Sequence, residues 1–205
     1  MVTIETLMSL EKQHAEEEAK TLTGDDISWL VNLLNEKDDK IRYQALLLLQ
    51  SRSAGFHDVY PYWDVFLQKL NSDNSYQRSI GLMLLAENAR WDTENRMEDA
   101  LDALLKILND EKPITVRQCI QALHQIIPYK RQLTEKIADA LISLEIAKIR
   151  PSMQKLVLTD ILGVLCVIRK QQPSGKIDAY IIQALSADIL DRKTKKEIEK
   201  MMAGQ

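Results

Sequence analysis

The sequence predicts an all-α fold of the α-solenoid type, in which pairs of antiparallel helices stack one after another along the chain. Apolar residues at positions i, i+3, i+4 and i+7, which mark one face of a helix, recur five times at intervals of 36 to 40 residues. A period of this length is typical of stacked helix pairs rather than of a single closed core. Only 6 Gly and 5 Pro are present, which leaves little turn chemistry for a β-rich fold.

Each apolar quartet marks the face that the first helix of a pair buries against its neighbours. The quartets are Ile27/Leu30/Val31/Leu34, Trp63/Phe66/Leu67/Leu70, Leu101/Leu104/Leu105/Leu108, Ile137/Ala140/Leu141/Leu144 and Ile177/Tyr180/Ile181/Ala184. A content of 45% hydrophobic and 28% charged residues is ordinary for a globular protein. We therefore expect these quartets to lie buried between consecutive helix pairs.

The elements follow in order from the N-terminus. A first helix over about 3–20, in an N-terminal segment 1–22, lies outside the repeats and is strongly acidic in its second half. Asp25 or Asp26 is placed to cap the next helix. The last helix, about 191–202, is dominated by charge, which suits a terminal repeat that has no neighbour to cover it. The chain is expected to form one elongated domain over 1–205, with repeats at 26–55, 58–91, 93–128, 130–170 and 175–203.

The turns within the first three repeats resemble one another. Asn35, Asn71 and Asn109 each follow the last apolar position of a quartet, where a helix can end in a left-handed residue that Asn tolerates. An acidic or polar segment comes next. An arginine then falls 8 or 9 residues after that apolar position, at Arg42, Arg78 and Arg117.

Two antiparallel helices per unit, an acidic turn and an arginine early in the second helix make the chain similar to HEAT repeats, one group of armadillo-like α-solenoids. Lys40-Ile41-Arg42 and Thr115-Val116-Arg117 resemble the start of the second HEAT helix. The resemblance covers about residues 25–200. It implies that acidic and arginine side chains form a structural ladder linking neighbouring units. The ladder residues would be Asp39, Arg42, Asp73, Arg78, Asp110 and Arg117.

The second helices carry the candidate functional surface. Helical phase places a set of uncharged side chains opposite the core-facing positions. Interfaces between proteins are depleted in charge at their centres and enriched in Met and Tyr, so this face is expected to bind a protein or peptide. Alternatively, the curvature of the array, the N-terminal helix or a second copy of the chain covers it. The face comprises Tyr43, Leu46, Leu47, Gln50, Ser79, Leu82, Met83, Ala86, Gln118, Gln121, Ala122 and Gln125.

Charge suggests a second hypothesis. The net charge is only −3, which argues against a general nucleic-acid binder, but residues 1–100 hold 10 Lys and Arg against 18 Asp and Glu, and residues 101–205 hold 17 against 12. A nucleic-acid-directed protein would use the basic half. It would do so around Lys130, Arg131, Lys148, Arg150, Arg169 and Lys170.

An aromatic cluster suggests that a nucleic-acid-directed protein of this kind would be an enzyme. DNA glycosylases of the alkylation-repair class are also built on HEAT-like units and resemble this protein in architecture. The cluster lies in the acidic half, where phosphate would be repelled, and two of its members are core positions, so packing is the favoured role. Its residues are Phe56, His57, Tyr60, Tyr62, Trp63 and Phe66.

No motif indicates a cofactor, a metal or a catalytic centre. His14, His57 and His124 lie in separate segments, without a second ligand at helical spacing. Cys119 and Cys166 sit inside apolar helical stretches and are expected to be core residues rather than a disulfide or zinc ligands. There is no glycine-rich phosphate loop and no nucleophile signature.

The sequence therefore predicts a non-enzymatic scaffold that binds a protein or peptide partner. The N-terminus lacks the pattern of a secretory signal, and the longest apolar-rich stretch, 156–168, is too short to span a bilayer, so a cytoplasmic protein without a membrane anchor is expected. The identity of the partner and the oligomeric state stay open, a homo-oligomer included.

Overall fold

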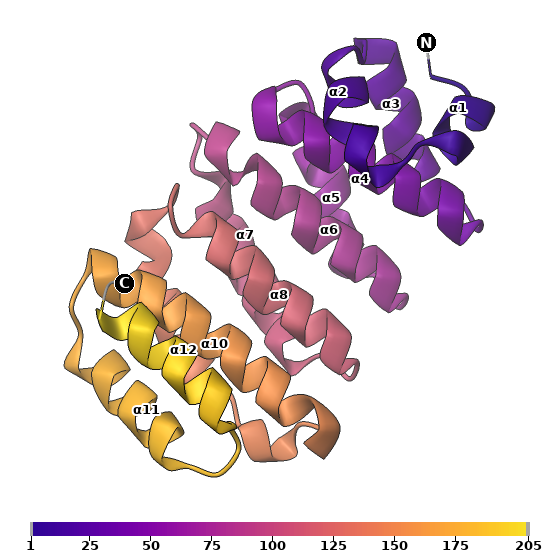
Figure 1. Ribbon diagram of the computed structural model, residues 1–205. Helices are drawn as coiled ribbons and strands as arrows, with labels where there is room; N and C mark the ends of the chain where they lie inside the picture. Colours follow the sequence, from indigo (N-terminus) through magenta and orange to yellow (C-terminus); the bar gives the residue numbers. More distant parts are fainter. Residues whose placement is uncertain (1, 204–205) are drawn as a thin grey trace. The chain divides into compact units, whose positions relative to one another are not determined.

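The computed structural model describes residues 2–203, and all regular secondary structure in that range is helical, with twelve α-helices and six short 3-10 helices (Figure 1). This confirms the predicted all-α class. The chain divides into two compact units, Met1–Ala100 and Leu101–Gln205. Each unit is a stack of helix pairs, which is the arrangement of an α-solenoid.

The first unit holds an N-terminal segment and two helix pairs, α3/α4 and α5/α6. Helix α4 is central to it and packs against α1, α2, α3 and α6. The elements are α1 (Ile4–Ser9), η1 (Lys12–His14), α2 (Ala15–Lys20), α3 (Gly24–Leu33), α4 (Asp39–Gly55), η2 (Tyr60–Tyr62), α5 (Trp63–Lys69), α6 (Ser75–Asn88) and η3 (Ala89–Trp91).

The prediction of one helix over 3–20 was wrong, because the segment breaks into α1, η1 and α2. Leu10 and Glu11 are extended between the two α-helices. Leu7 and Ala19 are both 1% exposed, and both α1 and α2 pack on α4. In one straight helix these two residues would be rotated by about 120° from each other, so a break is needed for both to face α4.

The second unit continues the same pattern with α7/α8, α9/α10 and α11/α12. Helix α8 packs against α10, and α10 packs against α9, α11 and α12. The elements are α7 (Arg96–Lys106, which begins in the first unit), η4 (Ile107–Asn109), α8 (Pro113–Ile126), η5 (Arg131–Leu133), α9 (Thr134–Ile142), η6 (Ile146–Lys148), α10 (Pro151–Gln171), α11 (Gly175–Ser186) and α12 (Arg192–Ala203).

Helix α10 has 21 residues and is longer than the apolar-rich stretch 156–168 identified in the sequence. By length and composition alone, this helix could cross a membrane. A core helix of a globular protein meets the same criterion. Val157, Ile161 and Leu165 of α10 are buried within the second unit, which is the position of such a core helix.

The apolar quartets form the core of both units. Leu30, Leu34, Phe66, Leu104 and Leu141 are essentially inaccessible to solvent, and no member of the five quartets is exposed. The last repeat is less polar than expected. Helix α12 is highly charged, but α11 and the segment after it expose the apolar side chains of Ile182 and Ile189.

The turn asparagines do not adopt the left-handed conformation that we predicted for them. Among the non-glycine residues that the structure describes, Asn95 alone has a positive φ, of 59°. The chain instead leaves α3 through tight turns, with the Asn35 amide donating to the Asn32 carbonyl. The side chain of Asn35 instead contacts the next repeat, where its oxygen accepts a hydrogen bond from Lys69 of α5 at 2.7 Å.

Candidate partner-binding face

The second helices of the first unit begin at side-chain caps. The Asp38 carboxylate accepts hydrogen bonds from the amides of Lys40 and Ile41, and the Asn74 side chain accepts one from the Tyr76 amide. These bonds satisfy amides that the first turn of a helix otherwise leaves without partners. They fix where α4 and α6 start.

The exposed face of the second helices is narrower than predicted. Tyr43, Gln121 and Gln125 are exposed, and Leu47, Gln50, Met83 and Gln118 are half-buried. The assignment of the remaining members to the outer face was wrong, because they are buried: Leu46, Ser79, Leu82, Ala86 and Ala122.

The reason is the number of neighbours that a second helix has. Helix α4 packs against α3 of its own pair and also against α1, α2 and α6, so it has neighbours on several sides. Helical phase gives the direction of the core correctly, but the width of the buried arc depends on how many helices surround the element. Leu46 is accordingly 8% exposed, whereas Leu47 next to it stays partly accessible.

The sequence reasoning missed two residues of this face. Tyr76 of α6 is 65% exposed, and Ile114 of α8 is 65% exposed. Tyr76 precedes Met83 by two helical turns, and Ile114 stands in the same relation to Gln121. Extending the same helical phase to the first turn of each helix would have identified both.

In the first unit, two aromatic side chains dominate the exposed face. Tyr43 of α4 is 50% exposed, and α4 packs directly against α6, which carries Tyr76. The Arg42 guanidinium lies 5.6 Å from the centre of the Tyr76 ring, so a side chain of α4 supports an aromatic ring of α6. Leu47 and Met83 continue this face along the two helices.

In the second unit, α8 and α10 also expose uncharged side chains. Ile114, Gln118 and Gln121 follow one side of α8, and Leu156 of α10 is 40% exposed.

Gly163 is half-buried in the middle of α10, and a Cβ built on it would meet no atom within 4 Å. The fold of the second unit therefore does not require a glycine at this position.

The arginines of the predicted ladder are engaged in different ways, and Asp73 contributes its backbone carbonyl rather than its side chain. The Arg42 guanidinium pairs with the Asp39 carboxylate and donates to the Glu36 carbonyl at 2.7 Å, so it closes the turn of its own repeat. Arg78 likewise donates to the backbone carbonyls of Ser72 and Asp73.

Arg117 links two repeats. Its Nε and Nη2 atoms donate to the Asp160 carboxylate of α10 at 2.6 and 3.2 Å, and this pairing raises the pKa of Arg117. Asp110 accepts a hydrogen bond from the Lys112 amide at 2.8 Å in the turn before α8. Asp160 was not among the predicted residues.

Lys69 connects the two repeats of the first unit from a buried position. Its side chain is 7% exposed, and its ammonium donates to the side-chain oxygens of Asn35 and Gln77. Gln77 in turn donates to the Leu34 carbonyl at 2.8 Å. Burial, with the nearby positive charge of Arg42, lowers the pKa of Lys69 to about 8.

The aromatic cluster considered as a base-binding site is occupied by contacts within the chain. Trp63 and Phe66 are buried in the core, as predicted. The Tyr60 hydroxyl donates to Asp92, and burial, followed by that bond, raises the pKa of Tyr60 to about 12. The Arg52 guanidinium lies 3.6 Å from the centre of the Phe56 ring.

The basic residues of the nucleic-acid hypothesis do not form one patch. Lys148 and Arg150 precede α10, whereas Arg169 and Lys170 are at its C-terminal end, about 30 Å away along a helix of 21 residues. Two of the six are not available to phosphate as free cations. Lys130 is 3% exposed, and Arg169 pairs with Asp178.

The histidines and cysteines are dispersed. His14, His57 and His124 lie on η1, in the loop after α4 and on α8, and residues 2–203 contain no group of three His, Cys, Asp or Glu side chains placed to hold a metal. Cys119 and Cys166 are buried free thiols, which confirms that they are core residues. Burial raises the pKa of both thiols.

The fold and the exposed helical faces place the chain among the α-solenoid repeat proteins. A designed armadillo repeat protein superposes with a TM-score of 0.66 at 16% identity, covering 97% of this chain and 91% of that one. Two engineered proteins that were structural genomics targets give TM-scores of 0.53 and 0.57 at 18% identity, covering 99% of this chain and 96% and 98% of theirs. No protein-family model and no curated protein matches the chain.

Proposed function

We propose that this protein is a non-enzymatic cytoplasmic scaffold that binds a protein or peptide segment on the exposed face of its second helices. The observation that carries the proposal is the pair Tyr43 and Tyr76, which are 50% and 65% exposed on two helices that pack against each other. Contiguous exposed aromatic and apolar side chains are characteristic of interaction surfaces.

Two further observations support the proposal. The side chains available on this face, Tyr43, Leu47, Tyr76 and Met83, combine rigid aromatic rings with adaptable apolar contacts, which is the composition of interface centres. The free thiols of Cys119 and Cys166 suit a reducing compartment. The similarity to engineered repeat proteins supports the repeat architecture on which such surfaces are built.

A peptide selection tests the proposal. The protein is immobilised and used to enrich a displayed library of random dodecapeptides, and an enriched peptide is synthesised and titrated by fluorescence anisotropy. Replacing Tyr43 and Tyr76 together by Ser is expected to weaken binding at least tenfold, because interface aromatic residues commonly contribute more than 1 kcal/mol each.

The matched control is Val65→Ser, which removes a partly exposed apolar side chain from α5, a first helix of the same unit. It is expected to bind the peptide as the wild type does. Peptide affinity unchanged in the tyrosine variant, or lost equally in the valine control, would refute the assignment of the binding face. Circular dichroism and the unfolding midpoint establish that each variant is folded.

A further inference from the structure

The uneven charge of the sequence coincides with the division of the structure into units. The first unit ends at Ala100 and the second begins at Leu101. Residues 1–100 hold 10 Lys and Arg against 18 Asp and Glu, and residues 101–205 hold 17 against 12. One compact unit therefore has an excess of acidic residues and the other an excess of basic residues.

The N-terminal segment of the first unit presents an acidic surface. Glu16, Glu17 and Glu18 are consecutive on α2, and all three are exposed. Glu5 and Glu11 add two exposed carboxylates on α1 and directly before η1. The two cations between residues 2 and 26 are Lys12 and Lys20, and Lys20 already pairs with Glu17 at 2.7 Å.

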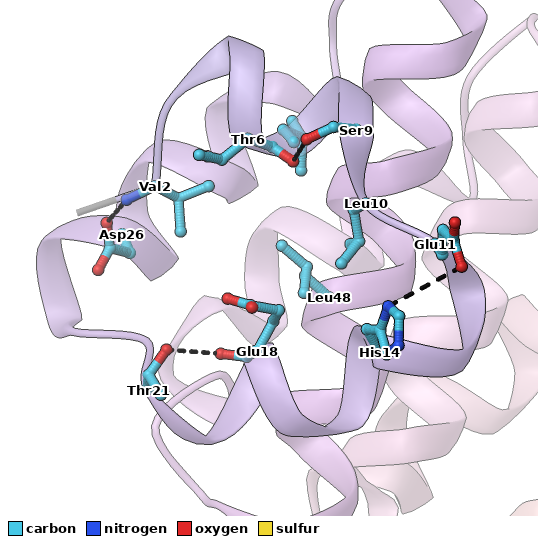
Figure 2. A pocket seen from close by; sticks show the side chains of 11 residues that line it. Val2, Thr6, Ser9, Leu10, Glu11, His14, Glu18, Thr21, Asp26 and Leu48 are labelled. Carbon is cyan, nitrogen blue, oxygen red and sulfur yellow. Dashed lines mark hydrogen bonds and ion pairs between the residues drawn. The ribbon is translucent and has the colours of Figure 1, made fainter.

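A hollow of about 370 Å³ adjoins this acidic surface. Its lining includes the apolar side chains of Leu10 and Leu48 and the carboxylates of Glu11 and Glu18. Figure 2 shows the Glu18 carboxylate pointing into the hollow, while Glu11 lies at its edge beside His14. No Lys or Arg lines the hollow, so a positively charged side chain with an apolar stem fits its chemistry.

The last helix of the second unit has an excess of the opposite charge, with five basic residues against Glu197 and Glu199. Thr194 and Ile198 are the buried residues of α12, which packs on α10. The exposed or half-buried basic residues of α12 are Arg192, Lys193, Lys195, Lys196 and Lys200. Only Lys193 has a carboxylate within 4.0 Å, that of Glu197, among the ion pairs that the structure describes for this helix.

We propose that two copies of this protein associate through these surfaces, with the basic face of α12 of one copy lying on the α1–α2 surface of the next. The occupant is a second copy because the same chain supplies both complementary surfaces in equal number. Ile4 and Met201, which are 43% and 42% exposed, add an apolar contact on each side. Since the two surfaces differ, each copy that binds by one surface keeps the other free, and association continues beyond the dimer into rings or open chains.

Contacts between exposed charges are screened by salt within about 10 Å at 0.1 M ionic strength. We therefore expect the weight-average mass in sedimentation velocity to rise with protein concentration in about 20 mM NaCl, and to fall to that of the monomer in about 300 mM NaCl. A protein that stays monomeric at low salt over the accessible concentrations would overturn the proposal.

Charge reversal identifies the surfaces. One variant carries Glu16→Lys, Glu17→Lys and Glu18→Lys, and a second carries Lys193→Glu, Lys195→Glu and Lys196→Glu. Each is expected to be monomeric alone, because its two surfaces then have like charge. Mixing the two variants is expected to restore association, because the basic α2 of one meets the acidic α12 of the other. A mixture that stays monomeric contradicts the proposed pairing.

The matched control reverses three exposed acidic residues elsewhere in the first unit, with Glu94→Lys, Glu98→Lys and Asp99→Lys. It changes the net charge by the same amount as the α2 variant. We expect it to associate as the wild type does. Loss of association in this control would attribute the effect to net charge rather than to the α2 surface, and would overturn the assignment.

Discussion

Gly81 of α6 approaches the backbone of α5 so closely that a Cβ built on it would lie 2.6 Å from the carbonyl oxygen of Phe66. The added Cβ would also lie 3.1 Å from the side chains of Leu70 and Lys69. A methyl group cannot occupy this space unless α5 and α6 separate. The glycine therefore sets the spacing of the second helix pair.

Gly81→Ala is expected to destabilise the protein by about 1–3 kcal/mol, the usual range for overpacking a closely packed core. Chemical denaturation measures the change. Helix propensity alone would make the substitution stabilising, so a gain in unfolding free energy would contradict the close approach of the two helices.

Gly163→Ala is expected to have the opposite effect. Gly163 lies within α10, and no atom would contact an added Cβ. Alanine is favoured over glycine in a helix interior by about 0.5–1 kcal/mol, and the unfolding free energy should rise by that amount. A destabilised variant would show that the second unit leaves no space at this position.

Lys69 is expected to make stability depend on pH in the alkaline range. Its pKa is lowered from 10.5 to about 8 in the folded protein. Between these values the unfolded chain binds more protons than the folded one, so the unfolding free energy contributed by this group rises with pH. It is expected to be constant below the folded pKa and again above the unfolded one.

The test compares urea denaturation of the wild type and Lys69→Met at several pH values from 7 to 10.5. The difference in unfolding free energy between them should change across this window in favour of the wild type. Lys40→Met, at an exposed position, is the control and should show no such trend. A difference that is independent of pH would mean that the ammonium of Lys69 is as well solvated as in the unfolded chain.

Leu104 and Asp102 test the phase of α7. Leu104 is fully buried, whereas Asp102 is exposed and pairs with Lys136 at 2.7 Å. Leu104→Ala should cost about 2–5 kcal/mol, the range for a deleted buried leucine. Asp102→Ala should cost less than about 1 kcal/mol, because exposed ion pairs contribute little. Equal losses in denaturation experiments would refute the assigned orientation.

Only part of the candidate site could be predicted from the sequence. Tyr43 and Gln121 were correctly placed on the exposed side, because helical phase follows from the 3.6-residue period alone. Leu82 and Ala86 were placed there as well, and they are buried. Phase gives the direction of a side chain but not the number of helices that surround it, so the width of the exposed face could not be read from the sequence.

The partners of the ladder residues could not be predicted from the sequence either. The arginines were found from their spacing, but Arg42 closes the turn of its own repeat whereas Arg117 reaches Asp160 in the next second helix. The two residues of that ion pair are 43 positions apart in the chain. No local pattern connects them, since the pairing depends on how α8 and α10 pack.

The sequence by itself determined the all-α class, the helix pairs and their buried quartets, because each follows from apolar spacing within a single helix. Tertiary structure decided where the N-terminal segment breaks, which outward positions stay exposed and why Gly81 is required. These depend on the distances between helices, and Lys69 is a further example. Its ammonium is held by Asn35 and Gln77, which lie 34 and 8 positions away and become neighbours only when the repeats stack.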